Sequence, residues 1–493
     1  MFSKVFRLVV LGLSLSYVTV NNPVQTSVAF AGIGYVVTYT LIPRLTTSFI
    51  NVGLKGKDLS KPPPVNEIAE SMGAVPAITY LFLMFGLIPF IFFKYLVSFN
   101  SLSNDDSISD NYATQYNALA NNRLFPHNKL AEYLSAVLCL QSTTMLGFLD
   151  DLFDIRWRHK FFLPAIASLP LLIVYYVDFS VTSVVVPAFV SNLPGGEIFL
   201  QFINQLIIIG NFIVSKITGL NFSTLNEFVV PRESPKLLDL GFFYYVYLAS
   251  VSIFAPNSIN ILAGVNGLEV GQSVILGVVF LVNDFCYLLS PNVSQAAYDS
   301  HLFSVIFIIP FLGVSLALLQ YNWFPARVFV GDTYCYFSGM VFAIVGILGH
   351  FSKTSLLFLV PQIVNFIYSV PQLFNIVPCP RHRLPKFNLD NGLMYPSYGN
   401  YREASTFGKL LVRSLEKFGL IKLVRDPSTK EIIQFSNMTI INLSLVWVGP
   451  LREDILCLLL LVVQLVIGLS MIAVRHTVGP WLFGYDNLSW GVK

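Results

Sequence analysis

The chain has 493 residues, of which 55% are hydrophobic and 12% charged, and this charged fraction is about half that of an ordinary soluble domain. The composition therefore excludes a protein that folds in water alone, and the net charge of +3, with no basic stripe along the chain, argues against a nucleic-acid partner. The five cysteines are far apart and mostly lie inside or beside apolar runs, which excludes a disulfide framework and is typical of packing residues.

Ten apolar runs are long enough to predict transmembrane helices, each of which needs about 20 apolar residues. The runs lie near residues 24–44, 74–97, 129–149, 161–177, 240–258, 268–289, 302–320, 327–348, 354–374 and 453–474. Two further segments are ambiguous. Residues 5–20 could form a cleaved signal, an anchor or an extra span, and residues 198–214 contain several Gln and Asn residues, which favours an interfacial or protein-packed helix as much as a span. We therefore predict an all-α polytopic membrane protein with about ten transmembrane helices.

One long polar segment, residues 378–452, interrupts the apolar pattern. A helical stretch near 404–419 and strand-like runs near 420–424 and 430–435 predict a small α/β appendage there. The chain accordingly divides into an N-terminal hydrophobic extension, a transmembrane catalytic core, this loop with its appendage, and the last transmembrane helix with a luminal tail. Their boundaries are 1–23, 24–377, 378–452 and 453–493.

Lys and Arg residues are distributed unevenly between the two sets of loops that ten crossings would create. The set that contains loops 44–73, 149–160, 259–267, 321–327 and 375–452 holds 19 of them, and the opposite set holds 5. Without the long last loop, to which the positive-inside rule applies poorly, the counts are still 8 and 5. The rule therefore predicts that the first set of loops, with the appendage, is cytoplasmic.

The first candidate site motif, LGFLDDLFDIRWRHK at residues 146–160, lies at the cytoplasmic end of the third span. Asp150, Asp151 and Asp154 fall within one helical turn, and the i, i+4 spacing places Asp150 and Asp154 on one face. Carboxylates beside an apolar segment are costly unless a metal or a cationic group compensates them, so the pair could hold a divalent cation or act as a base. The alternative is a solvated helix end flanked by ordinary basic anchors.

The next motif, NSINILAGVNGLEVG at residues 257–271, is a short loop between two apolar spans. The carboxamides of Asn257, Asn260 and Asn266 can ligate a hard cation or pair with a nucleobase edge, because each offers both a donor and an acceptor. Asn and Gly are also common turn formers, and that interpretation stays open for the loop in isolation.

Asp332 lies at the start of the eighth span, within WFPARVFVGDTYCYFSG at residues 323–339. A lone carboxylate facing lipid would be costly, so Asp332 must face a cavity, a partner or an ion. Three residues upstream, Phe329 could stack on a planar base, although an aromatic residue at a membrane boundary is more often part of the aromatic belt.

Two further motifs carry charge on the same side. In PCPRHRLPK, prolines stiffen the backbone around Arg381, His382 and Arg383, which suits these groups to a pyrophosphate but is also compatible with an ordinary positive flank. The weaker motif KGKDLSKPPPVNEIAESMG, at residues 55–73, contains Glu70 and further charged residues.

All five motifs fall in loops predicted to be cytoplasmic, although hydropathy and Lys/Arg counts placed those loops without reference to the motifs. Acidic groups, a Gly/Asn loop and an Arg/His cluster on one membrane face are the groups expected in an active site that uses Mg²⁺ to react a phosphate substrate. The alternative from another class is a transporter. It predicts ionisable residues near the bilayer midplane and favours internal repeats, and neither feature is evident in the sequence.

Together with VGILGHFSKT, these motifs resemble those of the eukaryotic UDP-N-acetylglucosamine–dolichyl-phosphate N-acetylglucosamine-1-phosphotransferases, in the polyprenyl-phosphate hexose-1-phosphate transferase superfamily. The resemblance spans residues 24–475, and the PCPRHR form looks eukaryotic. It implies transfer of GlcNAc 1-phosphate from UDP-GlcNAc to dolichyl phosphate, with release of UMP, as the first step in assembling the N-glycan lipid precursor. A bacterial cell-wall translocase of the same superfamily is the nearest alternative.

The resemblance also implies roles for the matching residues. Asp332 and Asn260 would be the metal ligands, Asp150 and Asp151 would engage the acceptor phosphate or help place the metal, and Lys160 and Arg383 would neutralise the donor pyrophosphate. The uracil-binding residues would be Asn266, Phe329 and Leu59, and the residues around the sugar and phosphate would be Glu70, Arg381 and His382. Of these, the candidate catalytic residues are Asp150, Asp151, Lys160, Asp332 and His382. Asp154 stands where the superfamily often has Asn, so its role stays open, as does the division of labour between Asp150 and Asp151.

The resemblance implies Mg²⁺ as cofactor, and UDP-GlcNAc, dolichyl phosphate, membrane lipid and a second copy of the chain as partners. It further implies an endoplasmic reticulum membrane protein whose active site faces the cytoplasm and which tunicamycin inhibits. The glycosylation sequons at Asn221, Asn292 and Asn487 fall on the expected luminal side, whereas those at Asn437 and Asn442 fall on the cytoplasmic side and are not expected to be used.

Overall fold

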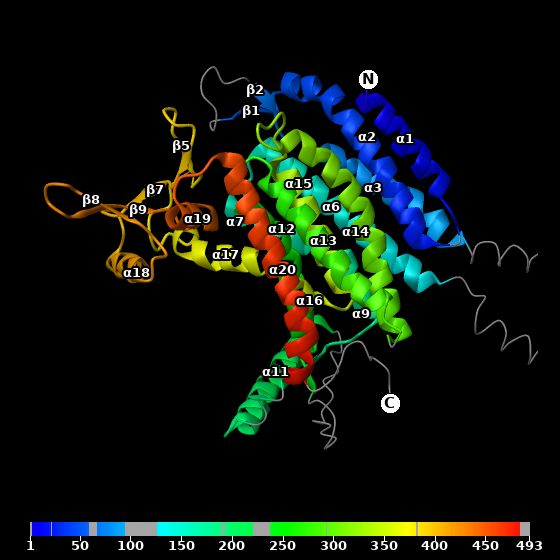
Figure 1. Cartoon of the computed structure of the whole chain (residues 1–493). Helices are drawn as coiled ribbons and strands as arrows, with labels where there is room; N and C mark the ends of the chain where they lie inside the picture. Colours follow the sequence, from blue (N-terminus) through cyan, green and yellow to red (C-terminus); the bar gives the residue numbers. More distant parts are fainter. Residues whose placement is uncertain are drawn as a thin grey trace, which may run out of the picture.

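The computed structural model describes residues 2–20, 22–58, 67–93, 126–187, 189–190, 193–219, 237–291, 293–380 and 383–483. Within these residues the chain forms a bundle of long helices, with a small appendage of strands and short helices beside one end of the bundle (Figure 1). This arrangement confirms the predicted class of a helical polytopic membrane protein with a small mixed appendage.

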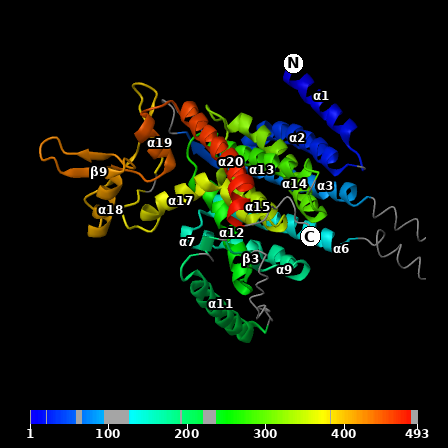
Figure 2. The same cartoon turned by 60° about the horizontal axis from the view of Figure 1, so that its bottom comes forward.

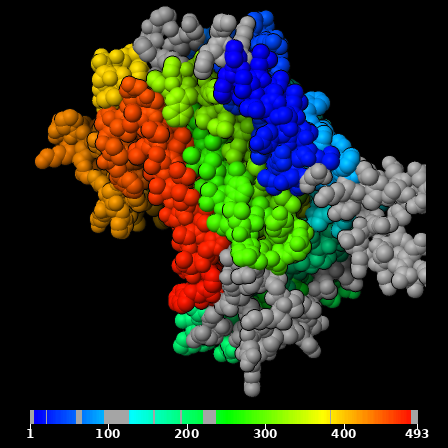
Figure 3. All heavy atoms as spheres, turned by 45° about the vertical axis from the view of Figure 1, so that its right-hand side comes forward, coloured from blue at the N-terminus to red at the C-terminus, as the bar shows by residue number. Residues whose placement is uncertain are grey.

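Nine of the described helices are long and apolar enough to cross a membrane. They are α2 (Pro23–Val52), α3 (Ala74–Ile91), α6 (His127–Phe153), α11 (Gly196–Thr218), α12 (Phe242–Ile261), α13 (Leu268–Leu288), α14 (Gln295–Asn322), α15 (Gly331–Leu348) and α20 (Glu453–Phe483). All of them except α11 coincide with a predicted run. Helices α14, α13 and α20 lie side by side along one face of the bundle, with α1 (Phe2–Tyr17) in front (Figure 3), and α2 packs against α14. The shorter helix α1 packs along α2.

Two predicted spans, 161–177 and 354–374, are each broken, so the expectation of one continuous helix in each place was wrong. The pieces are α8 (Leu163–Ala167), α9 (Leu169–Asp178), α16 (Ser352–Phe358) and α17 (Val360–Leu373). Helices α16 and α17 meet at 71°. A proline occupies the first turn of α9 and of α17, a position at which the missing N–H of proline is tolerated. Proline also disfavours helical backbone in the preceding residue, which favours a break at this point.

Helix α11 contains the ambiguous residues 198–214, and the strands on either side of it show where its ends lie. Strand β3 (Ser183–Val185) precedes α11 and pairs antiparallel with β4 (Leu237–Asp239), which follows it. Both ends of the intervening segment are therefore at the same end of the bundle. This is the end opposite the start of α15, because the hydroxyl of Tyr175 in α9 lies 3.3 Å from Nδ1 of His350, just beyond the last turn of α15.

A crossing by α11 would require a return crossing through residues 219–236. That stretch contains two Glu, one Arg and one Lys, which a membrane span does not tolerate easily. In Figure 1, α11 also runs across the end of the bundle, whereas α1, α2 and α14 run along it. Helix α11 therefore extends from the far end of the bundle, although by length and composition it is one of the nine candidate spans.

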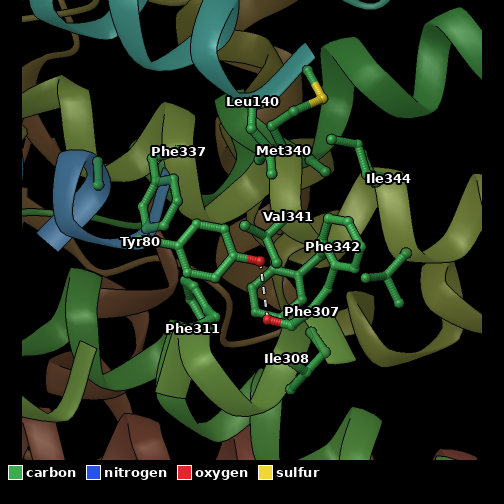
Figure 4. Close-up of a cluster of buried hydrophobic side chains, with 14 of the residues drawn as sticks. Tyr80, Leu140, Phe307, Ile308, Phe311, Phe337, Met340, Val341, Phe342 and Ile344 are labelled. Carbon is green, nitrogen blue, oxygen red and sulfur yellow. Dashed lines mark hydrogen bonds between the residues drawn. The ribbon is translucent and has the colours of Figure 1, made fainter. Parts of the chain in front are cut away.

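An aromatic core surrounds α15. Tyr80 from α3, Phe307 and Phe311 from α14, and Phe337 from α15 are all completely buried and pack together (Figure 4). The hydroxyl of Tyr80 donates to the carbonyl oxygen of Phe307 at 3.0 Å, as a buried hydroxyl requires a partner. Helix α15 is buried along most of its length, so this core fixes its start, which carries Asp332, relative to the neighbouring helices.

The appendage lies beside the start of α20 (Figure 2). Its elements are β5 (Lys386–Phe387), β6 (Met394–Tyr395), β7 (Tyr398–Asn400), α18 (Thr406–Lys417), β8 (Leu423–Arg425), β9 (Ile432–Ser436) and α19 (Ile440–Val448). Strands β7, β9 and β8 form an antiparallel sheet in that order. The helix α18 and the strands β8 and β9 confirm the elements that the sequence predicted here, whereas α19 was not predicted.

Candidate active site

Three of the predicted motifs meet around the ammonium group of Lys160, in the single-turn helix α7 (Trp157–Lys160). Its Nζ lies 2.8 Å from Oδ2 of Asp150, near the end of α6, and 2.8 Å from Oδ2 of Asp332, at the start of α15. The side chain of Asp150 is 2% exposed and that of Lys160 is 19% exposed. Asn260, near the end of α12, hydrogen-bonds to the Asp332 side chain. These four residues are called the charge cluster below.

Lys160 stays positively charged in this cluster. Burial by itself lowers the pKa of a lysine, because it removes water from the ammonium group. The carboxylates of Asp332 and Asp150 outweigh this effect and raise the pKa of Lys160 above its ordinary value. Asp332 and Asp150 therefore hold the ammonium group between two helix ends that are far apart in the sequence.

Asp151 makes a different set of contacts and binds the first turn of α15. Its Oδ1 accepts a hydrogen bond from the backbone N–H of Asp332 at 2.6 Å, and its Oδ2 accepts from the N–H of Thr333 at 3.2 Å and from the Thr333 hydroxyl. A carboxylate here is an N-cap supplied by another helix and matches the positive end of the helix dipole. Gly331, with a φ of +71°, permits the approach, because a Cβ there would lie 2.4 Å from Oδ2 of Asp151. Asp151 therefore positions Asp332.

We expect Asp151→Ala to destabilise the protein, because the first N–H groups of α15 lose a partly buried acceptor at a cost of about 1–3 kcal/mol. Thermal unfolding in detergent should begin at a lower temperature than for the wild type. Asp151→Asn keeps one acceptor oxygen and, as the matched control, should unfold at an intermediate temperature. An unchanged unfolding temperature for Asp151→Ala would contradict the capping role.

The predicted pairing of Asp154 with Asp150 on one helix face is wrong. Helix α6 ends at Phe153, and Asp154 has left-handed backbone, with a φ of +47°, that turns the chain out of the helix. Its side chain is exposed, and no contact within the described chain joins it to Lys160 or Asp332. The spacing argument failed because it assumes that the helix continues through both residues.

A second group of contacts surrounds the loop between α12 and α13. The side chain of Asn266 is buried, and its Nδ2 donates to Oδ2 of Asp58 at 2.8 Å. The backbone N–H of Asn266 donates to Oε1 of Glu453, the first residue of α20, at 2.8 Å. Sequence reasoning missed Glu453, whose only signal was an acidic pair directly before the last apolar run. Asp58 therefore holds the carboxamide of Asn266, and Glu453 holds its backbone.

Phe329 joins the segment before α15 to the strand pair β1 (Lys55–Lys57) and β2 (Glu67–Ala69). Its N–H donates to the carbonyl oxygen of Ala69 at 2.8 Å. Its ring lies against Gly56, where an added Cβ would be 3.1 Å from Cδ2 of the ring and 3.3 Å from Oε2 of Glu70. Burial and the negative charge of Asp332 raise the pKa of Glu70. The charge of Asp332 therefore acts on Glu70, although Glu70 is an exposed residue.

Arg383 lies beside the Asn266 loop. The next residue, Leu384, packs on Gly264 so closely that a Cβ at Gly264 would be 1.9 Å from its Cδ2. Nη1 of Arg383 is buried and has no hydrogen-bond partner among the described residues. Burial also lowers the pKa of this guanidinium. A buried guanidinium nitrogen without a hydrogen-bond partner is costly, so this position favours the binding of an anion.

Three predicted site residues, Leu59, Arg381 and His382, lie outside the described residues. Their roles therefore stay predictions from the sequence.

Asp332 and Asn260 offer the oxygen donors that Mg²⁺ prefers. The described part of the chain contains no group of three His, Cys, Asp or Glu residues that could enclose an ion. Mg²⁺ does not need such a cage, because it commonly takes one or two protein oxygens and completes its shell with water and substrate phosphate. A carboxylate and a carboxamide that are hydrogen-bonded side by side fit this requirement.

Known proteins are similar to this chain over most of its length. The model of glycosyl transferase family 4 matches residues 133–350, a range that contains all four residues of the charge cluster. The chain is 53% identical over 471 residues to the UDP-N-acetylglucosamine–dolichyl-phosphate N-acetylglucosaminephosphotransferase of Saccharomyces cerevisiae, covering 95% of this chain and 94% of that protein. For the proteins of the same name from Schizosaccharomyces pombe and Dictyostelium discoideum, the identities are 44% and 38%. These matches cover 97% and 87% of this chain, and 97% and 83% of the relatives.

Proposed function

The chain belongs to the UDP-N-acetylglucosamine–dolichyl-phosphate N-acetylglucosaminephosphotransferase family, and we propose that it uses the charge cluster to transfer GlcNAc 1-phosphate from UDP-GlcNAc to dolichyl phosphate. The observation that carries the assignment of the site is the pair of 2.8 Å contacts that join Asp150, Lys160 and Asp332 at one end of an apolar bundle. The products are UMP and GlcNAc-PP-dolichol.

In the proposed reaction, an oxygen of dolichyl phosphate attacks the β-phosphorus of UDP-GlcNAc. A new P–O bond forms, the bond from the β-phosphorus to the bridging oxygen breaks, and UMP leaves with that oxygen. A phosphate dianion is already a nucleophile, so charge neutralisation and in-line positioning lower the barrier more than base catalysis does. We propose a single displacement. A phospho-GlcNAc adduct trapped on Asp150 or Asp151 would contradict it.

The proposed phosphate-binding groups are Lys160 and Arg383. The charged state of Lys160 and the unpartnered, buried Nη1 of Arg383 support this role. Asp150, which binds Lys160 and accepts from the N–H of Ile155 at 3.1 Å, would hold Lys160 toward the acceptor phosphate. For Asn266, the hydrogen bond from Nδ2 to Asp58 supports a role in which the carboxamide oxygen accepts from uracil.

Mg²⁺ is the proposed cofactor, and Asp332 and Asn260 would hold it. When bound, it would compensate the charge of the donor pyrophosphate. Asp151 would act only indirectly, by keeping the backbone at Asp332 in place.

The proposed location is the endoplasmic reticulum membrane, with the charge cluster facing the cytoplasm, and the Lys/Arg asymmetry of the loops supports this orientation. We expect no glycan at Asn437 or Asn442, which are 1% and 0% exposed. The sequons expected to be luminal, at Asn221, Asn292 and Asn487, lie outside the described residues. Mass spectrometry of the protein from its native membranes, with and without endoglycosidase, would check this pattern. A glycan on Asn437 or Asn442 would overturn the orientation.

The proposed function is tested with purified protein, labelled UDP-GlcNAc, dolichyl phosphate and Mg²⁺, by following the release of UMP. Undecaprenyl phosphate as acceptor and UDP-N-acetylmuramoyl pentapeptide as donor test the bacterial alternative in parallel. No UMP from the wild type with the first pair of substrates would overturn the proposal. The family also supports a homodimer and inhibition by tunicamycin, which size measurement and the same assay would test.

A further inference from the structure

A pair of buried side chains in the appendage binds the backbone of Arg383. The carbonyl oxygen of Arg383 accepts a hydrogen bond from Nδ2 of Asn442, in α19, at 2.8 Å and another from the hydroxyl of Ser397 at 3.1 Å. Oδ1 of Asn442 accepts from the N–H of Ser397 at 2.8 Å. Both side chains come from residues that are at most 3% exposed, so water does not compete for these bonds.

The carboxamide of Asn442 can adopt only one orientation. Its Nδ2 donates both to Arg383 and to Oγ1 of Thr439, at 2.8 Å, while its oxygen accepts from Ser397. All of its donors and at least one acceptor site are therefore used. A fully satisfied buried polar group of this kind specifies a single local structure, because any other arrangement leaves a polar atom unpaired.

The guanidinium of Arg383 has the opposite character. Its Nη1 is buried without a hydrogen-bond partner among the described residues, so no bond at this atom fixes the side chain. The hydrogen bonds that hold this residue are instead at its backbone carbonyl oxygen. Within the described chain, the hydrogen bonds to that carbonyl oxygen come from the appendage, across 59 and 14 residues of sequence.

We propose that Asn442 is a positioning residue for Arg383, and that the appendage thereby completes the site for the donor pyrophosphate. This inference rests on the proposed function. A cation that is fixed before the substrate arrives binds an anion more tightly than a mobile one, because less conformational entropy is lost on binding. Asn442 itself touches no substrate.

The test compares Asn442→Ala with Asn437→Ala. Asn437 is a matched control, since it is also buried, also lies in a sequon, and also makes carboxamide hydrogen bonds, to Ser397 and from Gln372, but none to Arg383. Asn442→Ala should raise KM for UDP-GlcNAc and the dissociation constant of UDP-GlcNAc, measured by calorimetry, about tenfold, the effect of losing roughly one charge-assisted interaction. KM for dolichyl phosphate should change less than twofold. Asn437→Ala should leave both KM values within about twofold of wild type.

A double-mutant cycle separates positioning from general destabilisation. In an Arg383→Ala background, Asn442→Ala should have no further effect on donor binding. Equal increases in both KM values in the two Asn variants, or a persisting effect in the Arg383→Ala background, would overturn the proposal. If Asn442→Ala does not fold, Ser397→Ala removes the weaker bond, and an unchanged donor affinity in that variant would also overturn it. Absence of UMP release by the wild type would instead count against the proposed function.

Discussion

Asp332→Ala should lower kcat/KM for UMP release by about 10³-fold or more. Loss of one preorganised electrostatic group at a reacting centre commonly costs about 10²–10³ in rate, and Asp332 serves both Lys160 and the proposed Mg²⁺. The rate of UMP release at saturating and subsaturating UDP-GlcNAc would measure the loss. Raising the Mg²⁺ concentration should not restore the alanine variant, because the missing oxygen is one of only two proposed protein ligands.

Folding should not be the cause of this loss. Asp151 binds the backbone N–H groups of residues 332 and 333, which alanine retains, so the first turn of α15 keeps its cap. Asp332→Ala should therefore unfold at nearly the same temperature as the wild type, unlike Asp151→Ala. Asp332→Asn, which keeps the shape without the charge, is the matched control. Activity of Asp332→Ala within tenfold of wild type would remove Asp332 from the proposed mechanism.

Lys160→Ala should lower kcat/KM by about 10²–10³-fold, because it removes a cation at which charge develops and leaves two carboxylates close together. Asp150 is 2% exposed, so its carboxylate would lose its counter-ion away from water. Lys160→Arg keeps the charge but replaces a compact ammonium with a planar fork, and we expect an activity between those of wild type and Lys160→Ala. More than a tenth of wild-type activity in Lys160→Ala would contradict this role.

The ion pairs of Lys160 also lead to a prediction about the effect of pH. The carboxylates around Lys160 raise its folded-state pKa above the ordinary 10.5, despite the opposing effect of burial. Its ion pairs therefore contribute stability that is fully present below 10.5 and is lost only as the pH rises through the folded-state pKa. Between about pH 6 and 9, Lys160 should not titrate. A pH–rate profile of Lys160→Arg with the same shape as that of wild type in this interval would agree, and a shifted basic limb would not.

Sequence patterns located the charge cluster correctly because each motif lies at the end of an apolar run. The ends of a run mark where the chain enters or leaves the bilayer, and Asp150, Asn260 and Asp332, which lie at such ends, meet in the structure. Patterns failed where a helix ended early. Helix α6 ends at Phe153, and the left-handed backbone of Asp154 turns the chain away from the helix axis, which hydrophobic periodicity cannot predict.

The roles of the two neighbouring aspartates show a different limit. Asp150 and Asp151 are adjacent and chemically identical in sequence, yet one binds Lys160 and the other caps α15. Successive residues on a helix point about 100° apart and so meet different neighbours. Which neighbours they meet depends on helices that lie elsewhere in the chain.

The amino-acid sequence by itself determined that the chain lies in a membrane, where most of the candidate spans lie, and which loops carry the polar motifs, because these properties depend on local composition. The tertiary structure alone decided that Asp151 caps α15, that the chain on the two sides of α11 meets at one end of the bundle, and that Glu453 and Asn442 bind the backbones of Asn266 and Arg383. These features depend on contacts between residues 181, 187 and 59 positions apart, and on the pairing of β3 with β4. Contacts at such separations follow from the packing of whole helices, which no local pattern in the sequence records.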